Sequence, residues 1–415
     1  RPCRPRLCRQ PELLNPISKH HRQWRDWRLA TTTDDTVGQL LVNDREGSMR
    51  AALHEGLNHL LLVDDVEVEE PRADEVLVRV SHCGICHSDL SFVDTGLGSD
   101  EPIILGHEAA GTVAAVGSTV TTVAVGDRVM LTPLAPCGHC YWCSRGEPTA
   151  CAEAHSLLAG TRPDGTTPFS RAGHLVKQGV GVGAFSEFTV VSERGVVRLD
   201  PDTPLEIACV IGCAVQTGVG AVVNTAQVEP GATVLVVGLG GIGISVVQGA
   251  RLAGASQVIV SDPVAGRRDA ALHFGATLTV DPMEDDVVAR AVEATAGIGV
   301  DYAFEAAGIA ALVSTCLDST RRHGTTVVVG VDASMATTEF LPVMLSMQGK
   351  SIVGTLLGDC HPQRDIPMLL AAWRSGRLDL ESMISHRLDL SEVNEGLDRL
   401  RRADGIRTVL EVGGS

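Results

Sequence analysis

The clearest pattern of hydrophobic and polar positions in the chain lies between Thr233 and Asp262. A short β-branched run is followed by a glycine cluster, by apolar positions at helical spacing, and by a second β-branched run that ends in an acid. This order predicts one β-α-β unit. Downstream we expect strands at 277–280, 300–305 and 325–331 and helices at 266–274, 285–296 and 310–319. Alternating strands and helices predict an α/β fold with a doubly wound parallel sheet.

The pattern upstream of this unit is different. From residue 49 to about residue 130, β-branched runs such as 76–80, 111–116 and 127–131 alternate with turn residues, which predicts a compact all-β region. Near the end of the chain, 367–374 and 391–402 have the apolar spacing of amphipathic helices. A chain of 415 residues is long enough for two domains with separate cores.

Two uncharged segments raise the alternative of membrane insertion. Residues 232–250 are about long enough to span a bilayer. Their glycines, Gln248 and β-branched ends favour a buried strand and helix instead. Residues 207–228 contain polar side chains, among them Gln216 and Asn224, and we interpret them as core as well. We therefore expect no membrane partner.

Composition narrows the class of protein. A formal net charge of −17 makes nucleic acid or an anionic membrane an improbable partner. Twelve cysteines in an acidic chain without a recognisable secretory signal fit a reducing cytoplasm, where clustered thiols more often hold metal than form disulfides. The Arg-rich residues 1–48 have no sustained period; we expect a disordered or mis-assigned extension, with a transit peptide as the alternative.

The glycine cluster is a candidate phosphate site. Gly238, Gly240 and Gly243 form G-x-G-x-x-G directly after the first strand, and Gly241 makes the turn smaller still. Missing side chains let backbone N–H groups and a helix N-terminus approach a pyrophosphate. Asp262, at the end of the second strand, can accept hydrogen bonds from a ribose diol and would repel a 2′-phosphate, which predicts NAD rather than NADP. The alternative is a tight helix-strand contact without ligand.

A second candidate site joins distant parts of the chain. Cys86, His107 and Cys213 supply two thiolates and one imidazole, a three-ligand zinc set that leaves the fourth position open for catalysis. Asp89 can orient His107, and Glu108 can tune the metal or coordinate it transiently. Taken singly, each residue has a simpler interpretation as a buried cysteine or a satisfied core histidine.

Four further cysteines lie in one short stretch: Cys137, Cys140, Cys143 and Cys151. Four thiolates at this spacing predict a closed, tetrahedral structural zinc site, against the alternatives of free thiols or two disulfides. The stretch has few apolar residues, so metal must supply much of its folding free energy. The sequence therefore predicts two zinc ions per subunit.

With both cysteine sets, Gly106-His107-Glu108 and the dinucleotide unit in this order, the chain resembles the zinc-dependent medium-chain alcohol dehydrogenases from Met49 to its C-terminus. Residues 160–166 are similar to the longer loop of the dimeric branch, which includes thiol-dependent formaldehyde dehydrogenases. Residues 358–360 and 364–367 are similar to bacterial members, mycothiol-dependent formaldehyde dehydrogenase among them.

The resemblance implies a GroES-like catalytic domain at 49–214 that is completed by 357–415, with a Rossmann domain inserted at 215–356. It also implies roles by matching position. Cys86, His107 and Cys213 would hold catalytic zinc, and Ser88 would take the alcohol proton. Contacts with NAD would come from residues matched as follows: His87 and Arg407 at the pyrophosphate, Thr217 at the nicotinamide and Arg267 near the adenosine ribose.

Three positions depart from well-known members of the family. Ser91 replaces a histidine that ends the proton relay, and Pro133 replaces a pocket aromatic. His155 replaces an arginine that binds a glutathione carboxylate, and histidine lacks the bidentate fork of arginine. We therefore expect free primary alcohols as substrates first, the mycothiol adduct of formaldehyde second and the glutathione adduct third.

The predicted reaction is reversible oxidation of a primary alcohol, or of a hemithioacetal, by NAD, with zinc as Lewis acid and Ser88 relaying the proton. We expect a homodimer or homotetramer. Two other classes stay open. A zinc-binding structural or storage protein would not need the glycine motif or Asp262, and a zinc-free quinone or enone reductase would not need Cys86, His107 and Cys213.

Overall fold

The computed structural model describes residues 48–56, 58–96, 101–154, 159–331 and 334–413. The expected N-terminal extension lies outside the described residues up to position 47, and so does His155. Ser48 belongs to the first described strand and pairs with Glu67, so that strand includes one residue before the expected start at Met49.

The all-β region is confirmed and consists of a closed barrel and a second sheet. Its strands are β1 (Ser48–His54), β2 (Leu61–Val68), β3 (Glu75–Ile85), β4 (Ile103–Ile104), β5 (Glu108–Val116), β6 (Arg128–Leu131), β7 (Phe169–Arg171), β8 (His174–Gln178), β9 (Phe188–Ser192) and β10 (Val196–Arg198). The barrel has the order β1-β2-β7-β8-β4. The second sheet runs β10-β6-β5-β3 and continues into two C-terminal strands, β18 (Arg407–Glu411) and β17 (Ile384–Asp389).

Alternating side chains explain why these strands pair. In β3, Val76, Val78 and Val80 are all fully buried on one face. They belong to a core that also contains Phe169 and Phe185. Burying each such side chain contributes about 1.5–3 kcal/mol.

The loop at 160–166 is fastened to β3 by a buried ion pair. The Arg162 side chain is 7% exposed, and its Nε and Nη2 donate to the two carboxylate oxygens of Glu75 at 2.7 and 2.8 Å. Its Nη1 donates to Glu69 at 2.7 Å. This two-pronged geometry matches the planar fork of arginine to a carboxylate, so the loop has a defined anchor.

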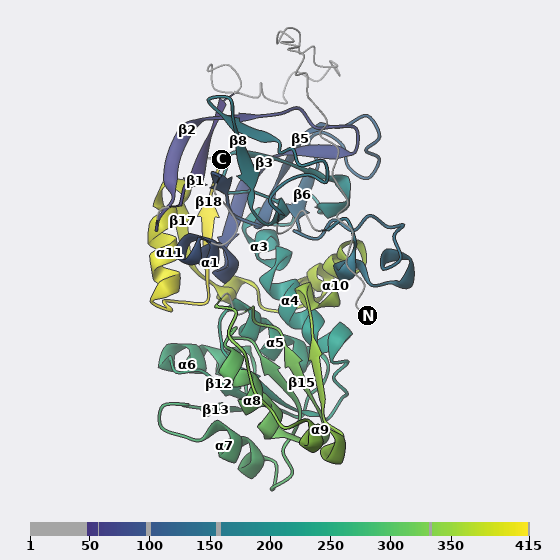
Figure 1. Ribbon diagram of the computed structural model, residues 1–415, viewed down its shortest axis with the longest axis vertical. Helices are drawn as coiled ribbons and strands as arrows, with labels where there is room; N and C mark the ends of the chain where they lie inside the picture. The colour runs from purple at the N-terminus through teal and green to yellow at the C-terminus, as the bar shows by residue number, and fades with distance from the viewer. Residues whose placement is uncertain (1–47, 57, 97–100, 155–158, 332–333, 414–415) are drawn as a thin grey trace, which may run out of the picture. The chain divides into compact units, whose positions relative to one another are not determined.

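The predicted doubly wound sheet is confirmed (Figure 1). Its elements are β11 (Thr233–Val237), α5 (Gly241–Leu252), β12 (Gln257–Ser261), α6 (Ala265–Phe274), β13 (Leu278–Val280), α7 (Val287–Ala294), β14 (Val300–Glu305), α8 (Ala310–Ser319), β15 (Thr320–Val328), α9 (Pro342–Gln348) and β16 (Ser351–Gly354). All neighbours in the order β13-β12-β11-β14-β15-β16 are parallel. Helix α9 and strand β16 were not predicted from the sequence, because both are short and β16 has no buried residue.

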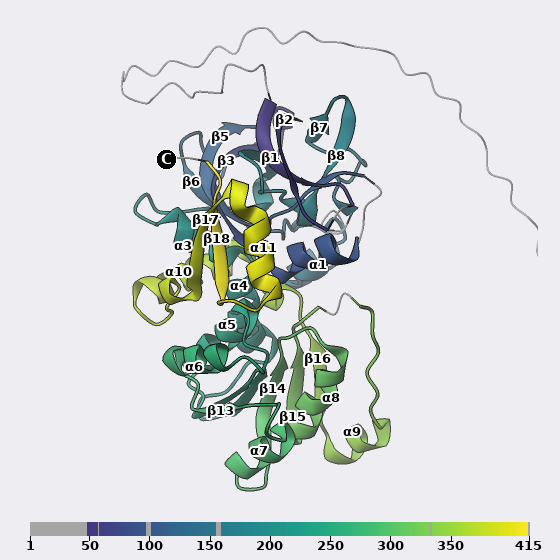
Figure 2. The same ribbon diagram turned by 90° about the vertical axis from the view of Figure 1, so that its left-hand side faces the viewer.

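Two further helices belong to the first region, α1 (His87–Thr95) and α11 (Val393–Arg401). Three others lie where the chain passes between the regions: α3 (Leu205–Cys209), α4 (Ala214–Gly220) and α10 (Pro362–Arg374). The prediction that the first C-terminal helix starts at 367 is wrong, since α10 begins five residues earlier. Pro367 lies inside it and removes only one backbone hydrogen bond near the N-terminal end. Figure 2 shows α11 beside β17 and β18, which it contacts.

No single helix in the described part of the chain is long and apolar enough to cross a membrane. The bent pair Leu205–Gly212 and Ala214–Thr225 passes that test on length and composition. Every residue from 207 to 222 is buried within the fold, which agrees with the interpretation of that stretch as core, but residues 223–227 of the predicted 207–228 core segment are partly buried or exposed.

Candidate active site

Four predicted site residues meet in one buried group. Ligand atoms of Cys86, His107, Glu108 and Cys213 all lie within 4.8 Å of one another. Cys86 precedes α1, His107 precedes β5, Glu108 begins β5, and Cys213 precedes α4. The fold thus unites residues from three separate segments. Two thiols and an imidazole form a donor set that suits zinc.

His107 is held by Asp89. Its Nδ1 lies 3.2 Å from Asp89 Oδ1, and Asp89 also accepts hydrogen bonds from the backbone N–H groups of Cys86 and Gly106. Burial opposes protonation of His107, but the charges of Asp89 and Cys86 outweigh it and raise its pKa. With Nδ1 engaged, Nε2 is available as a metal ligand. Gly106 is required here, because a Cβ would lie 2.5 Å from the Phe185 ring.

Glu108 joins this group to Arg407. Its Oε1 lies 2.9 Å from Arg407 Nη2 and accepts from the Ala214 N–H at 3.2 Å. Burial raises the pKa of Glu108 to about 8, although the charge of Arg407 opposes that shift. Among the described residues, Oε2 has no hydrogen-bond partner. A buried, unpaired carboxylate oxygen beside two thiols and an imidazole fits an additional cation in the group.

The four closely spaced cysteines also converge. The sulfur atoms of Cys137, Cys140, Cys143 and Cys151 lie within 4.8 Å of one another, and those of Cys137 and Cys143 are 4.0 Å apart. Tetrahedral coordination with Zn–S bonds of about 2.3 Å requires sulfur separations of about 3.8 Å. The four are free cysteines, and the backbone N–H groups of Cys137 and Cys140 donate to sulfurs of the set. The geometry fits a closed metal site better than disulfides.

Hydroxyl groups lie at the edge of the buried group. Ser88 Oγ is 3.8 Å from Cys86 Sγ. Thr217, one turn into α4, has a buried hydroxyl without a hydrogen-bond partner in the described structure. Ser91 donates to the carbonyl of His87 at 2.9 Å, so its hydroxyl hydrogen is engaged by the backbone. Ser88 is therefore the serine of α1 that faces the site.

The glycine motif lies where strand and helix meet. Gly238 directly follows β11, Gly240 precedes α5, and Gly241 and Gly243 lie in its first turn. A Cβ on Gly241 would lie 2.7 Å from the Arg407 guanidinium. The absence of a side chain therefore lets Arg407 approach the helix N-terminus, where an anion is stabilised.

Asp262 lies at the end of β12 beside this turn and is 4% exposed. Its Oδ2 accepts from the Leu239 N–H and its Oδ1 from the Val264 N–H, both at 2.8 Å. The carboxylate therefore shapes the turn as well as facing it. Each oxygen has a second lone pair for a ribose hydroxyl.

Three basic side chains converge on the same region. Burial lowers the pKa of His87 and of Arg267, and the charge of Arg407 lowers both further. The Nε atoms of Arg267 and Arg407 are buried and unpartnered among the described residues. Buried, unpaired donors around a helix N-terminus fit a bound pyrophosphate.

Two further residues were not found from the sequence. Leu134 and Leu357 belong to one buried cluster with Cys86, Cys213 and several cysteines of the second set. Leu134 lies in an irregular segment and Leu357 begins a three-residue helix, far away along the chain. No local pattern distinguishes them, so only the fold identifies them as neighbours of the site.

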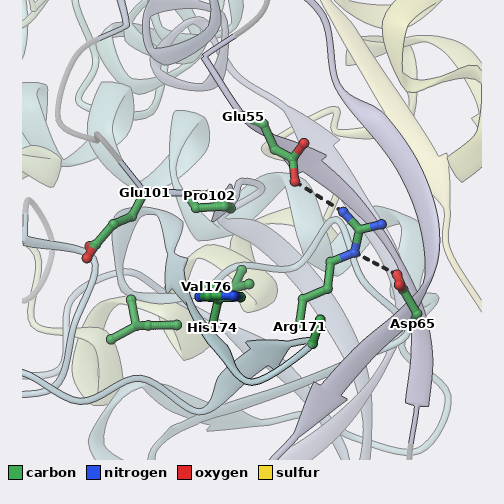
Figure 3. Close-up of a pocket in the computed structure, with 9 residues that line it drawn as sticks. Glu55, Asp65, Glu101, Pro102, Arg171, His174 and Val176 are labelled. Carbon is green, nitrogen blue, oxygen red and sulfur yellow. Dashed lines mark hydrogen bonds and ion pairs between the residues drawn. The ribbon is translucent and has the colours of Figure 1, made fainter.

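A separate pocket of about 410 Å³ lies on the closed barrel and shares no residue with the site (Figure 3). Arg171 at its rim donates to Glu55 at 3.1 Å and to Asp65 at 2.7 Å. One guanidinium is thus shared between two carboxylates, so the Arg171 charge is already engaged within the protein. The pocket contains no set of candidate metal ligands among the described residues.

Comparisons with known proteins agree with this geometry. Family models for an alcohol dehydrogenase GroES-like domain and a zinc-binding dehydrogenase match residues 72–201 and 241–374. Alcohol dehydrogenase 6 of Rattus norvegicus is 35% identical over 84% of this chain and 94% of its own length. An S-(hydroxymethyl)glutathione dehydrogenase of Escherichia coli O139:H28 is 36% identical over 87% of this chain and 99% of its own length.

Among solved structures, benzyl alcohol dehydrogenase from Acinetobacter calcoaceticus superposes with a TM-score of 0.83 at 28% identity, covering 88% of this chain and 99% of that protein. The domain models and the relatives cover most of the length between them. The chain therefore belongs to the zinc-dependent medium-chain alcohol dehydrogenase family, whose members are oxidoreductases that act on the CH–OH group.

Proposed function

We propose that this protein oxidises primary alcohols to aldehydes, reversibly, with NAD as hydride acceptor. One observation carries the proposal: a buried group of two cysteines, a histidine and a glutamate is tied through Arg407 to the glycine turn of the dinucleotide unit. A metal and a nicotinamide cofactor bound at these places would share one substrate.

Cys86, His107 and Cys213 would hold the catalytic zinc, with Glu108 as a transient fourth ligand. Zinc there would act as a Lewis acid that lowers the pKa of a substrate hydroxyl. Asp89 keeps the His107 ring oriented by its 3.2 Å contact. Ser88, with its Oγ 3.8 Å from Cys86 Sγ, would accept the hydroxyl proton and pass it outward.

The cofactor would lie along the carboxyl ends of β11 and β12. Arg407 and His87 would bind the pyrophosphate with the N-terminus of α5, Arg267 and Asp262 the adenosine ribose, and Thr217 the nicotinamide side. NAD supplies a ring carbon that accepts hydride from the substrate carbon. Glu108 contacts Nη2 of Arg407 on the metal side, and the unpaired Nε would remain for the phosphate.

We propose a structural role for the second zinc, held by the sulfurs of Cys137, Cys140, Cys143 and Cys151. We propose the domain boundaries 49–214 and 357–415 for the catalytic part and 215–356 for the nucleotide part. Metal analysis and NAD titration of one purified sample test both sites. One zinc ion or none per subunit, or no NAD binding, would contradict the assignment.

For the substrate we rank free primary alcohols first. By the family resemblance Pro133 stands in place of a pocket aromatic, which would leave room beside the metal group for aryl or longer alkyl chains. The relatives named S-(hydroxymethyl)glutathione dehydrogenase favour a thiol adduct of formaldehyde as the second candidate, and we place the mycothiol adduct before the glutathione adduct. Measuring kcat/KM for benzyl alcohol, hexanol and both adducts decides the order; a best result with the glutathione adduct, by about tenfold or more, overturns it.

We also propose a cytoplasmic homodimer or homotetramer. Strand β16 is the last strand of the parallel sheet, and the nearby segment presents exposed apolar side chains, among them Val331, Leu341, Val343 and Met347. Apolar surface beside an open sheet edge favours pairing with a second copy. Sedimentation of the wild-type protein and a Leu341→Glu variant tests this, and a monomeric wild type would refute it.

A further inference from the structure

The segment between β16 and α10 turns through three consecutive left-handed residues. Leu357, Gly358 and Asp359 have φ values of 50°, 66° and 49°. Glycine adopts this conformation freely and aspartate tolerates it, but in leucine the Cβ crowds the following carbonyl oxygen. Such a strained backbone conformation is stable only where contacts with the surrounding structure stabilise it.

The Asp359 side chain makes stabilising contacts of this kind. Its Oδ1 accepts a hydrogen bond from Thr149 Oγ1 at 3.2 Å, and its Oδ2 accepts one from Thr225 Oγ1 at 2.6 Å. The hydroxyl oxygen of Thr355, just after β16, lies 2.8 Å from that of Thr225. One carboxylate thus joins three segments that are distant in sequence.

Two of these segments lead directly to metal-ligand candidates. Thr149 lies in a short helix, η2 (Pro148–Ala150), that immediately precedes Cys151. Thr225 ends η6 (Ala221–Thr225), which continues α4 from Cys213. Asp359 therefore links the four-cysteine loop to the helix that begins at the catalytic group.

The backbone of the turn is pressed against the same helix. A Cβ on Gly358 would lie 2.5 Å from the Gln216 carbonyl oxygen and 2.7 Å from Gly220 Cα. Asn224 donates through Nδ2 to the Gly358 carbonyl at 3.1 Å. In this position the turn places Leu357 in the buried cluster with Cys86 and Cys213.

We propose that Asp359 is a positioning residue: by tying Thr149 and Thr225 to the left-handed turn, it fixes Leu357 as the apolar wall beside the metal group and so sets the preference for bulky alcohols. The inference rests on the proposed function, since a hydroxyl that reaches Cys86 and Cys213 brings its side group against this wall. A small alcohol such as ethanol leaves most of the wall uncontacted, whereas benzyl alcohol uses it.

Four variants distinguish the hydrogen bonds of Asp359 from the left-handed backbone conformation at this position. Asp359→Gly removes both hydrogen bonds while keeping the left-handed conformation accessible, and Asp359→Asn keeps one acceptor oxygen. Thr149→Val and Thr225→Val each remove one donor at nearly constant volume. The control is Asp285→Gly, at an exposed position before α7. If Thr149 acts only through Asp359, Thr149→Val adds little in the Asp359→Gly background.

Steady-state kinetics give the first readout. In Asp359→Gly, kcat/KM for benzyl alcohol should fall about tenfold, mainly through KM, while the value for ethanol stays within about twofold. Each Thr→Val variant should shift the same ratio in the same direction, Asp359→Asn should lie between, and the control should equal the wild type. An unchanged ratio in Asp359→Gly, or an equal loss with both alcohols, overturns the proposal.

Hydrogen exchange of a peptide covering 355–361 gives a second readout, independent of activity. Exchange should speed up in Asp359→Gly and in both threonine variants, and not in the control. A wild-type protein that oxidises neither alcohol would refute the proposed function instead. The exchange result alone would then decide whether Asp359 holds the turn through Thr149 and Thr225. Unchanged exchange in Asp359→Gly would refute the claim that Asp359 stabilises the left-handed turn.

Discussion

Asp262 gives the sharpest test of cofactor choice. Because its two oxygens accept the N–H groups of Leu239 and Val264 at 2.8 Å each, an alanine at this position would leave two buried donors unpaired at about 1–3 kcal/mol each. That variant would disturb the glycine turn together with the ribose contact. Asp262→Asn is the better perturbation, since its amide oxygen keeps one of the two acceptors.

The expected size of the effect follows from the charge that is lost. A hydrogen bond from a ribose hydroxyl to a carboxylate contributes about 1.5–3 kcal/mol. Because about 1.4 kcal/mol corresponds to a factor of ten, kcat/KM for NAD should fall by about tenfold to a hundredfold. Two unit charges about 5 Å apart repel by about 3 kcal/mol at an effective dielectric constant of about 20. Removing the repulsion of a 2′-phosphate should therefore leave kcat/KM for NADP equal or higher.

The assay is initial-rate kinetics with both cofactors at a fixed alcohol concentration. The matched control is Asp281→Asn, since Asp281 follows the neighbouring strand β13, pairs with Arg268 and lies at the same sheet edge. We expect at least about a tenfold preference for NAD in the wild type and in the control, and its loss in Asp262→Asn. Equal activity of the unmutated enzyme with NAD and NADP would refute the reasoning.

Three further outcomes are expected. Cys86→Ala should stay folded, lose turnover and bind one zinc ion fewer, whereas Cys140→Ala should cost solubility because metal stabilises its loop; elemental analysis and circular dichroism check both. A chain starting at Met49 should match the full chain in activity and melting temperature, and failure to fold would move the boundary. Arg162→Met should lower the free energy of unfolding by about 3–5 kcal/mol by stranding a buried carboxylate, but Arg72→Met, at an exposed pair, by less than about 1 kcal/mol; equal losses in urea denaturation would contradict this.

Much of the fold follows from local signals. Between Thr233 and Val328 the strands and helices alternate with glycines and caps that fix their ends, and the predicted elements agree with the structure within a few residues at most boundaries. Helix α7 starts at Val287 because Asp286 caps it by accepting from the Ala289 N–H. The elements that were missed or shifted, α9, β16 and the start of α10, have weak patterns or a proline that sequence rules treat as a stop.

The candidate site also contains residues that the sequence identifies and residues that only the fold identifies. Cysteine spacing within one loop made the group from Cys137 to Cys151 visible, and a motif beside a strand identified Gly238 and Asp262. The contact between Asp359 and Thr149 has no sequence signal, because a hydrogen bond across 210 positions depends on how the chain returns from the parallel sheet. The backbone role of Asp262 was missed although its partners Leu239 and Val264 lie within or just after the same β-α-β unit, because the motif indicates only the ribose contact.

The C-terminal strand β18, which pairs with β3 in the second sheet, explains how the candidate metal group and the candidate cofactor site lie next to each other. In the second sheet β3 lies between β5 and β18, so Glu108 at the start of β5 and Arg407 at the start of β18 flank the end of β3, just before Cys86. Antiparallel pairing of both neighbours with β3 brings the two side chains to 2.9 Å at that end. A one-residue slip in either pairing would turn Glu108 or Arg407 to the opposite face. Register in this sheet therefore fixes both the buried charge beside the metal group and the donor beside the glycine turn.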